Sequence, residues 1–303
     1  MQWCCCTLAG IMTLFAGVSI IAGMYALRHR LVDCMAFNVA QDLQNITAAV
    51  PVMNKFSGVV ITYNGEEYLA RCLESLFKVC DDVVVIDSHS DDNTVAIARK
   101  SGAEVIDHDF LGDGPQRSLG VLHCRHDWVI NLDQDEILDD DLIGMLVRLD
   151  LHDPDIEAYE CRRKNHLHGK WIKVAGWYPD YICRIFNKHK TDFSQVKTHA
   201  RIQTTRLRRL NGHILHYSFR DLQDMINRLN LYSDWQAESL FQSGKKVSSM
   251  TPVIRGMISF IKHYIVKRGV LAGLDGLTIS TLNALGSYFK YAKLIERHEQ
   301  KKA

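Results

Sequence analysis

The chain has 303 residues, of which 47% are hydrophobic and 23% are charged, and its formal net charge is +1. A chain of this length and composition can bury a large core, so we expect one main domain with additions. The nine cysteines do not show the spacing of a zinc site, and we expect no nucleic-acid partner.

The small net charge hides an uneven distribution along the chain. Acidic residues far outnumber basic ones in residues 101–160, whereas residues 201–303 contain seventeen Lys or Arg and seven Asp or Glu. An acidic middle is typical of a metal site, and a basic tail favours an anionic surface such as a membrane or an anionic acceptor. A solvated basic helical face would give the same pattern.

The first 52 residues differ from the rest. Residues 3–27 form an uncharged segment that is long enough to span a bilayer, and two arginines follow at positions 28 and 30. The positive-inside rule would then leave the downstream chain in the cytoplasm. Alternatively, Met53 is a natural start, and residues 1–52 are an upstream extension of the gene model. We therefore divide the chain into residues 1–52, 53–218 and 219–303.

Strands and helices alternate regularly after Met53. Apolar runs predict four buried strands, and amphipathic or polar stretches between them predict three helices. This order predicts an α/β domain with a parallel sheet and helices on both faces. The predicted strands are residues 58–62, 82–87, 103–107 and 128–133, and the predicted helices are residues 66–78, a segment after residue 94 that ends near 102, and a segment that follows residue 117.

Two aspartates follow the fourth strand. Ligands of open α/β sheets lie at the carboxyl ends of strands, where Asp133 and Asp135 fall. Side chains at i and i+2 of an extended chain share one side, so both carboxylates could face one Mg²⁺ or Mn²⁺. Alternatively, these acids cap the helix that we expect to begin near Asp139.

Asp87 ends the second strand and could accept hydrogen bonds from a ribose or a base. Alternatively, Asp87 or Ser90 caps the next helix. The turns lack both the glycine-rich dinucleotide motif and a P-loop, which argues against a dinucleotide dehydrogenase and a P-loop kinase.

After residue 136 the pattern changes. Further strands are predicted that extend the sheet, and then a long amphipathic helix over residues 219–242. Two apolar segments interrupted by glycines and charges come last, and they favour an interfacial membrane-associating region or an ordinary helical subdomain rather than a spanning helix. These strands are residues 158–162, 181–186 and 213–217, and the apolar segments are residues 253–266 and 270–285.

Three motifs together resemble the signatures of family 2 glycosyltransferases, which have the GT-A fold. They are residues 61–64 (ITYN) with Glu66 and Glu67 behind them, residues 87–94 (DSHSDDNT) and residues 132–136 (LDQDE). Four further motifs resemble a narrower group, the bacterial lipopolysaccharide inner-core β-glucosyltransferases: residues 114–117 (GPQR), 176–180 (GWYPD), 215–218 (LHYS) and 290–293 (KYAK). The resemblance covers about residues 53–296.

The resemblance implies a role for eight residues. Asp133 and Asp135 would coordinate Mg²⁺ or Mn²⁺ on the diphosphate of the donor, and Asp180 would be the catalytic base. The narrower group often has an acid where this chain has Ala200, after Thr198 and His199. Either that acid is not the base in the narrower group, or Asp180 serves alone in this chain. The residues implied to bind the nucleotide-sugar are Thr62, Asn64, Glu66, Asp87 and Arg117.

By this resemblance we expect an inverting, metal-dependent transferase that moves a sugar, with glucose as the first candidate, from a UDP-sugar. Its acceptor would be a lipid-linked glycan, such as a lipopolysaccharide core, at the cytoplasmic face of the inner membrane. Two alternatives remain open at this point. A nucleotidyltransferase of similar fold would release pyrophosphate instead of UDP, and a non-catalytic, membrane-associated module would bind glycan without transferring sugar.

Overall fold

The computed structural model describes residues 54–196 and 200–301, all of which belong to a unit that spans Met53–Ala303. The apolar segment at residues 3–27, with its proposed membrane anchor, lies outside the described residues. So do Met53, Thr198 and His199. The domain boundaries after residues 52 and 218 stay predictions.

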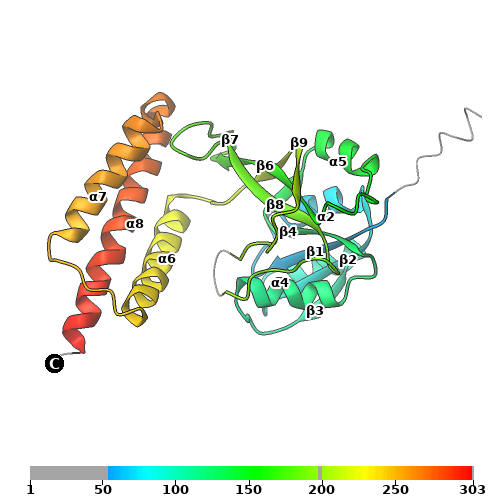
Figure 1. The fold of residues 1–303 in the computed structure, drawn as a ribbon, viewed down its shortest axis with the longest axis horizontal. Coiled ribbons are helices and arrows are strands. Elements are labelled where there is room, and N and C mark those ends of the chain that lie inside the picture. Colours follow the sequence, from blue (N-terminus) through cyan, green and yellow to red (C-terminus); the bar gives the residue numbers. More distant parts are fainter. Residues whose placement is uncertain (1–53, 197–199, 302–303) are drawn as a thin grey trace, which may run out of the picture. The chain divides into compact units, whose positions relative to one another are not determined.

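The first half of the described chain is the predicted alternation of strands and helices (Figure 1). Its four strands are parallel and lie in the order β3-β2-β1-β4. The parallel sheet predicted from the apolar runs is therefore confirmed. The elements are β1 (Phe56–Thr62), α2 (Leu69–Phe77), β2 (Cys80–Asp87), α3 (Thr94–Lys100), β3 (Glu104–Asp107), α4 (Asp113–Leu122) and β4 (Trp128–Asp133).

Successive residues of β1 bury opposite faces of the sheet, as an extended chain requires. Val60 packs with Leu73 of α2 in the larger hydrophobic cluster. Val59 packs with Val121 of α4 in a second cluster on the other face. Because both faces are covered, the strand is an almost continuous apolar run, which is why the sequence predicted it.

The second half of the sheet is mixed. β8 runs antiparallel to β4, and the order continues as β4-β8-β6-β9-β5. The expectation that later strands extend the sheet is confirmed. β5 was not expected, because its three residues are too short a run to show a period. The elements are β5 (Glu136–Leu138), α5 (Asp140–Val147), β6 (Ala158–Leu167), β7 (Lys170–Trp171), β8 (Asp180–Asn187) and β9 (Leu207–His216).

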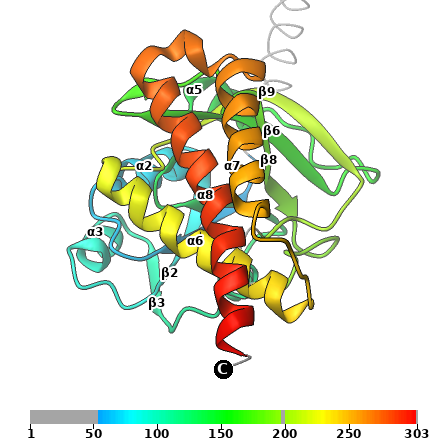
Figure 2. The same cartoon turned by 90° about the vertical axis from the view of Figure 1, so that its left-hand side faces the viewer.

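Three long helices end the chain, and α8 lies between α6 and α7 (Figure 2). A third hydrophobic cluster fastens them to the sheet, since Met225 of α6 and Ile279 of α8 pack with Leu167 of β6. Within the part of the chain that the structure describes, no helix is both long and apolar enough to cross a membrane. The elements are α6 (Leu222–Gln242), α7 (Thr251–Ile261), the π-helical turn η1 (Lys262–Val266), the 3₁₀ turn η2 (Gly269–Ala272) and α8 (Gly273–Gln300).

Candidate active site

The carboxyl ends of three neighbouring strands lie side by side. Thr62 at the end of β1 pairs in register with Asp87 at the end of β2, and Ile61 pairs with Asp133 at the end of β4. Ligands of open α/β sheets bind at this edge. The fold therefore brings together residues of all three sequence motifs, which lie at residues 61–67, 87–94 and 132–136 of the chain.

Asp87 is buried at this edge with a defined partner. Its two carboxylate oxygens accept hydrogen bonds from the Ser90 hydroxyl (2.5 Å) and the Ser90 backbone N–H (2.8 Å). The N-cap of α3 is Asn93, whose side chain makes no capping hydrogen bond, and the N–H of Thr94 at the start of the helix donates to Asp92 (2.9 Å). The alternative that Asp87 or Ser90 caps α3 is therefore wrong.

Asn64 and Glu66 join the turn after β1 to the turn after β2. The Asn64 side-chain oxygen accepts from Asp91 N (3.0 Å), while Asn64 N donates to the Ser90 hydroxyl (2.9 Å). One carboxylate oxygen of Glu66 accepts from the Asn93 side-chain amide (2.8 Å). Asn64 has a positive φ of 50°, a conformation that asparagine tolerates better than most residues. These contacts fix the shape of the loops, and the nucleotide-binding role of both residues stays a prediction.

Gln134, which the motif analysis passed over, connects β1 to β4. Its side-chain oxygen accepts from the Thr62 hydroxyl (2.6 Å) and Tyr63 N (2.8 Å), and its amide donates to Tyr63 O (3.2 Å). Gly65 leaves room for this amide, since a Cβ there would lie 2.5 Å from it. The Thr62 hydroxyl therefore helps to connect the ends of β1 and β4, and its contact with a nucleotide stays a prediction.

Two buried arginines hold Asp133. Arg117 contacts one carboxylate oxygen and Arg184 the other, each at 2.5 Å. Burial alone would raise the pKa of Asp133, but these two guanidinium groups hold it well below its usual range. Arg117 also bonds Asp113 and Asn131. The structure therefore gives Arg117 protein partners on three sides, and the diphosphate contact expected for it stays a prediction.

The arginines extend this contact into a network that sequence patterns did not reveal. Arg184 also contacts Glu136 (2.8 Å), Glu136 contacts Arg163 (3.0 Å), and Arg163 contacts Asp180 (2.8 Å). Within this network and the neighbouring Asp135 there are five carboxylates and three guanidinium groups. When all of these groups are ionised, the carboxylates exceed the guanidinium groups by two negative charges, which is the charge that one divalent cation neutralises. The carboxylates are Asp113, Asp133, Asp135, Glu136 and Asp180, and the guanidinium groups are Arg117, Arg163 and Arg184.

Asp135 lies in a turn rather than on the strand. β4 ends at Asp133, and Gln134 and Asp135 form the turn to β5. The argument that i and i+2 share one side of an extended chain is therefore wrong here, because the chain is not extended. The alternative that the pair caps α5 is also wrong, since Asp139 is the N-cap and accepts from Leu142 N.

Burial, with Asp133 and Glu136 nearby, raises the pKa of Asp135 to about 7. A carboxylate oxygen of Asp135 lies 3.7 Å from Nε2 of His216 at the end of β9. Burial, followed by the charge of Arg163, lowers the pKa of His216 to about 4, so the imidazole is neutral at pH 7.

The hydrogen bonds of His216 decide which ring nitrogen carries the proton. Its Nδ1 lies 2.6 Å from the side-chain oxygen of Asn165. The amide nitrogen of Asn165 donates to Trp177 O and to Asp180, both at 3.0 Å, so the oxygen is the acceptor. His216 therefore donates from Nδ1, and its acceptor atom Nε2 lies 3.1 Å from the Ser218 hydroxyl and 3.7 Å from the Asp135 carboxylate.

A divalent cation fits this pair in part. Among residues 54–196 and 200–301, no group of three or more His, Cys, Asp or Glu side chains could hold a metal. One carboxylate and one neutral imidazole are suitable protein ligands, and Mg²⁺ or Mn²⁺ takes further oxygens from phosphate and water. Asp133, whose oxygens both face arginines, fits a positioning role better than ligation. His216 belongs to the motif at residues 215–218, so sequence analysis could have proposed it.

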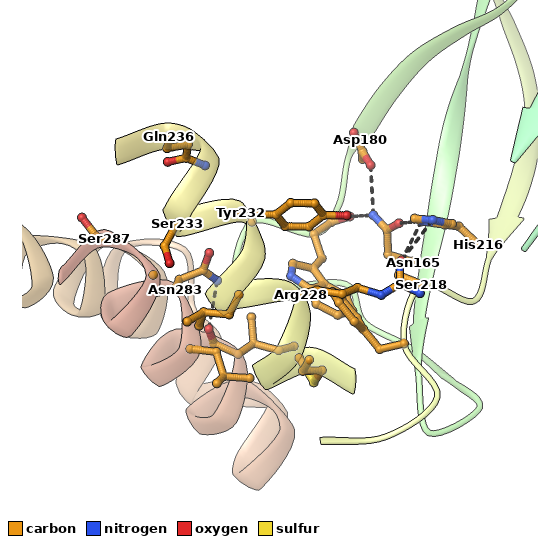
Figure 3. A pocket seen from close by; sticks show the side chains of 18 of the residues that line it. Asn165, Asp180, His216, Ser218, Arg228, Tyr232, Ser233, Gln236, Asn283 and Ser287 are labelled. Atoms are coloured by element: carbon orange, nitrogen blue, oxygen red, sulfur yellow. Dashed lines mark hydrogen bonds between the residues drawn. The ribbon is translucent and has the colours of Figure 1, made fainter. Parts of the chain in front are cut away.

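Asp180 lies on the wall of a cavity of about 540 Å³ between the sheet and helices α6 and α8 (Figure 3). Arg163 and Asn165 both bond its Oδ2, so within the described residues its Oδ1 is available to an incoming hydroxyl. Trp177 of the expected aromatic turn lines the same cavity, whereas Tyr178 packs edge-on against Trp171. Asn165 connects Asp180 to His216, and so joins the candidate base to the candidate metal ligands.

Residues 198–200, where the sequence differs from the narrower group, are described by the structure only at Ala200. Thr198 and His199 lie outside the described residues, and Ala200 donates its backbone N–H to Asp113 (2.7 Å). Ala200 has no side-chain acid, so Asp180 stays the candidate base.

Comparisons with known proteins agree with this architecture. The family model "Glycosyl transferase family 2" matches residues 57–214. A glycosyltransferase of Rickettsia typhi is 32% identical over 257 residues, covering 80% of this chain and 88% of the relative. The lipopolysaccharide core biosynthesis glycosyltransferase LpsC of Rhizobium meliloti is 27% identical over 259 residues, covering 81% and 93%. The chain belongs to glycosyltransferase family 2, and its resemblance to that family is confirmed.

Solved structures give a weaker match. The mannosyltransferase PcManGT of Pyrobaculum calidifontis aligns with a TM-score of 0.43 at 13% identity, covering 79% of this chain and 86% of that one. The enzyme class follows from the sequence family.

Proposed function

We propose that this glycosyltransferase moves glucose from UDP-glucose to a hydroxyl of a lipid-linked glycan, with inversion at the anomeric carbon. The observation that carries the proposal is the chain of contacts Asp180–Asn165–His216, which ends beside Asp135. It couples an acid on a cavity wall to the strand ends where the family motifs meet. A base and a place for the leaving diphosphate are the two requirements of this reaction.

In the proposed reaction, Asp180 acts as the general base from the cavity. The acceptor oxygen forms a bond to the anomeric carbon while the bond from that carbon to the diphosphate breaks. The acceptor proton passes to Asp180 Oδ1, and the bonding electrons leave with UDP. A carboxylate must lie within hydrogen-bond reach of the hydroxyl for this step. The bonds from Arg163 and Asn165 to Oδ2 fix the orientation of the carboxylate.

Asp135 and His216 would hold Mg²⁺ or Mn²⁺. A divalent ion there would neutralise negative charge on the departing diphosphate. Asp133 would act through Arg184 of β8 and Arg117 of α4, which join these elements to the end of β4. Thr62, Asn64, Glu66 and Asp87 would surround the nucleotide, because they form the adjoining edge at the ends of β1 and β2.

The acceptor is the least constrained part of the proposal. The relative LpsC, whose alignment covers 81% of this chain, is a lipopolysaccharide core biosynthesis glycosyltransferase, which supports a lipopolysaccharide core as the acceptor. The cavity beside Asp180 supports a glycan, because amide and hydroxyl side chains line it together with the indole of Trp177. A lipid-linked acceptor would place the enzyme at the cytoplasmic face of the inner membrane.

The substitution Asp180→Asn tests the assignment of the base. We expect transfer to fall roughly 10²–10⁴-fold, whereas UDP-glucose affinity stays unchanged, because the amide cannot accept the proton. Transfer is measured as UDP release in the presence of a glycan acceptor, and affinity is measured by calorimetry. Asp127→Asn is the control, since Asp127 is an exposed acid at the other end of β4. Near-normal transfer by Asp180→Asn would remove Asp180 as the base.

A further inference from the structure

Helix α7 has its apolar face on the outside. Where it packs on α8 its residues are small or polar: Gly256 approaches Ala284 O, and the Ser259 hydroxyl donates to Asn283 O (3.1 Å). Its large apolar residues point away, and Ile254 and Met257 are 51% and 61% exposed. A helix in a water-soluble protein normally has the opposite arrangement, with its apolar stripe facing the core.

The exposed apolar surface continues past α7. It follows η1 and η2 into the first turn of α8, where several side chains are more than two-thirds exposed. We call this surface the apolar ridge. Its most prominent members are Met257, Ile261, Ile265, Val266, Leu271 and Leu274. Isolated exposed apolar residues are common, but a continuous row of this length marks an interaction site.

The chain segment that carries the apolar ridge is basic. Residues 239–274 contain no Asp or Glu and six Lys or Arg, and Asp275, which follows in the first turn of α8, pairs with Lys170. Lys262 and Arg268 are exposed in the ridge segment itself, whereas the Lys267 side chain packs over Gly176. Basic side chains beside an apolar helix face are complementary to anionic phospholipid, into which the apolar residues insert while the cations meet headgroups.

The apolar ridge is also fastened to the candidate active site. Ala175 donates its backbone N–H to Lys267 O (2.8 Å), which joins η1 to the turn that carries Trp177 and Asp180. α8 lines the cavity through residues such as Asn283 and also packs against α7. A surface that bound the ridge would therefore lie one helix away from the cavity.

We propose that the apolar ridge docks the enzyme on an anionic phospholipid membrane, with α7 lying in the interface between headgroups and acyl chains. The inference deepens the proposed function and rests on it only for the identity of the acceptor. Docking would bring the cavity to the surface where a lipid-linked glycan is available. It does not require the chain to cross the membrane.

Site-specific oxidation of the full-length protein by hydroxyl radicals tests the proposal. We expect vesicles of phosphatidylethanolamine and phosphatidylglycerol (3:1) to slow oxidation of Met257 several-fold, and phosphatidylcholine vesicles to slow it much less. Oxidation of Leu122, which is 81% exposed on α4, should not change. Unchanged oxidation of Met257 with anionic vesicles would overturn the proposal. Slow oxidation of Met257 before lipid is added, or oxidation that slows as the protein concentration rises, would also overturn it. The apolar ridge would then be covered by another part of the chain or by a second copy.

A double variant, Val266→Glu with Leu271→Glu, gives the matched test. Both side chains are 71% exposed, so the fold does not depend on them, and Leu122→Glu is the control. We expect the double variant to lose the protection of Met257 and the control to keep it, while both bind UDP-glucose like the wild type. Protection that persists in the double variant would contradict docking by the ridge. A wild type that does not bind UDP-glucose, but whose Met257 is still protected by anionic vesicles, would contradict the proposed function and would not contradict docking.

Discussion

Acidic side chains at the two ends of the parallel sheet differ in the hydrogen-bond donors and cations that surround them. At the amino end, the carboxylate of one buried aspartate accepts hydrogen bonds from three donors. At the carboxyl end, buried and half-buried carboxylates together outnumber the arginines that face them. Both ends belong to the same strands, so the contrast separates what stabilises the fold from what prepares it for a ligand.

Asp82, near the start of β2, represents the amino end. Its carboxylate accepts from the Ser57 hydroxyl (2.5 Å), Arg125 N (2.7 Å) and Arg125 Nε (3.0 Å). Burial would raise the pKa of Asp82, but these hydrogen bonds and the charge of Arg125 lower it. A buried charge with a full set of donors stabilises the folded state.

Asp135 represents the carboxyl end. It is half-buried beside Asp133 and Glu136, and its pKa is raised to about 7 although the charge of Arg228 acts in the opposite direction. Asp133 and Glu136 form the ion pairs with Arg117, Arg163 and Arg184, and Arg228 pairs with Asp224. An acid kept in such a place destabilises the ligand-free protein, and strained or destabilised positions of this kind are typical of functional sites.

The largest effect should come from breaking the network at Arg184. Arg184→Met leaves Asp133 and Glu136 buried with fewer cations, and we expect a loss of roughly 3–5 kcal/mol in the free energy of unfolding. Urea denaturation measures it. Arg209→Met is the control, because Arg209 pairs with Glu160 on the surface and its loss should be too small to measure. A loss as small as that of the control would mean that the network does not stabilise this edge.

Asp135→Asn should have opposite effects on stability and activity. Removing the unpaired charge should raise the free energy of unfolding of the ligand-free protein by roughly 1–3 kcal/mol. Sugar transfer should fall roughly 10²–10³-fold, because charge on the diphosphate loses its counter-ion. Urea denaturation and UDP release measure the two quantities. A variant that is less stable than the wild type would place Asp135 with Asp82, as a structural acid.

Asp82→Asn should have the smaller and purely structural effect. We expect a loss of roughly 1–3 kcal/mol in the free energy of unfolding at pH 7, with sugar transfer unchanged. The pKa of folded Asp82 lies below the ordinary value of 3.8, so its stabilisation is present above that pH and is lost as the pH falls through the folded pKa. Urea denaturation at pH 7 and pH 3 should show the gap between variant and wild type closing at the lower pH. A constant gap would contradict the ionised carboxylate as its cause.

Much of the fold could be predicted from local pattern. The strands around Val60, Val85 and Ile130 are buried on both faces, so their apolar runs stand out, and the motifs at their ends fall at one edge by topology alone. Helix α2 begins at Leu69, three residues later than Glu66, because the preceding turn joins the two loops instead.

The pairing of charges in the candidate site could not be predicted in this way. Arg184 is 51 residues from Asp133, and only the antiparallel addition of β8 to β4 brings them into contact. His216 reaches Asp135 because β9 pairs with β5 immediately after the turn. The sequence predicts these acids as a group, but their division into members with and without an arginine partner depends on long-range sheet topology.

Binding of UDP-glucose to the full-length protein, measured by calorimetry with and without Mn²⁺, tests the central claim most directly. An edge with two surplus negative charges should bind a diphosphate weakly without the cation and at least about tenfold more tightly with it, which is a difference of about 1.4 kcal/mol. Asp135→Asn should abolish that difference, whereas Asp82→Asn should leave it intact. Equal affinity with and without Mn²⁺ would contradict the account. The carboxylates at the carboxyl end would then need no cation, like Asp82 at the amino end.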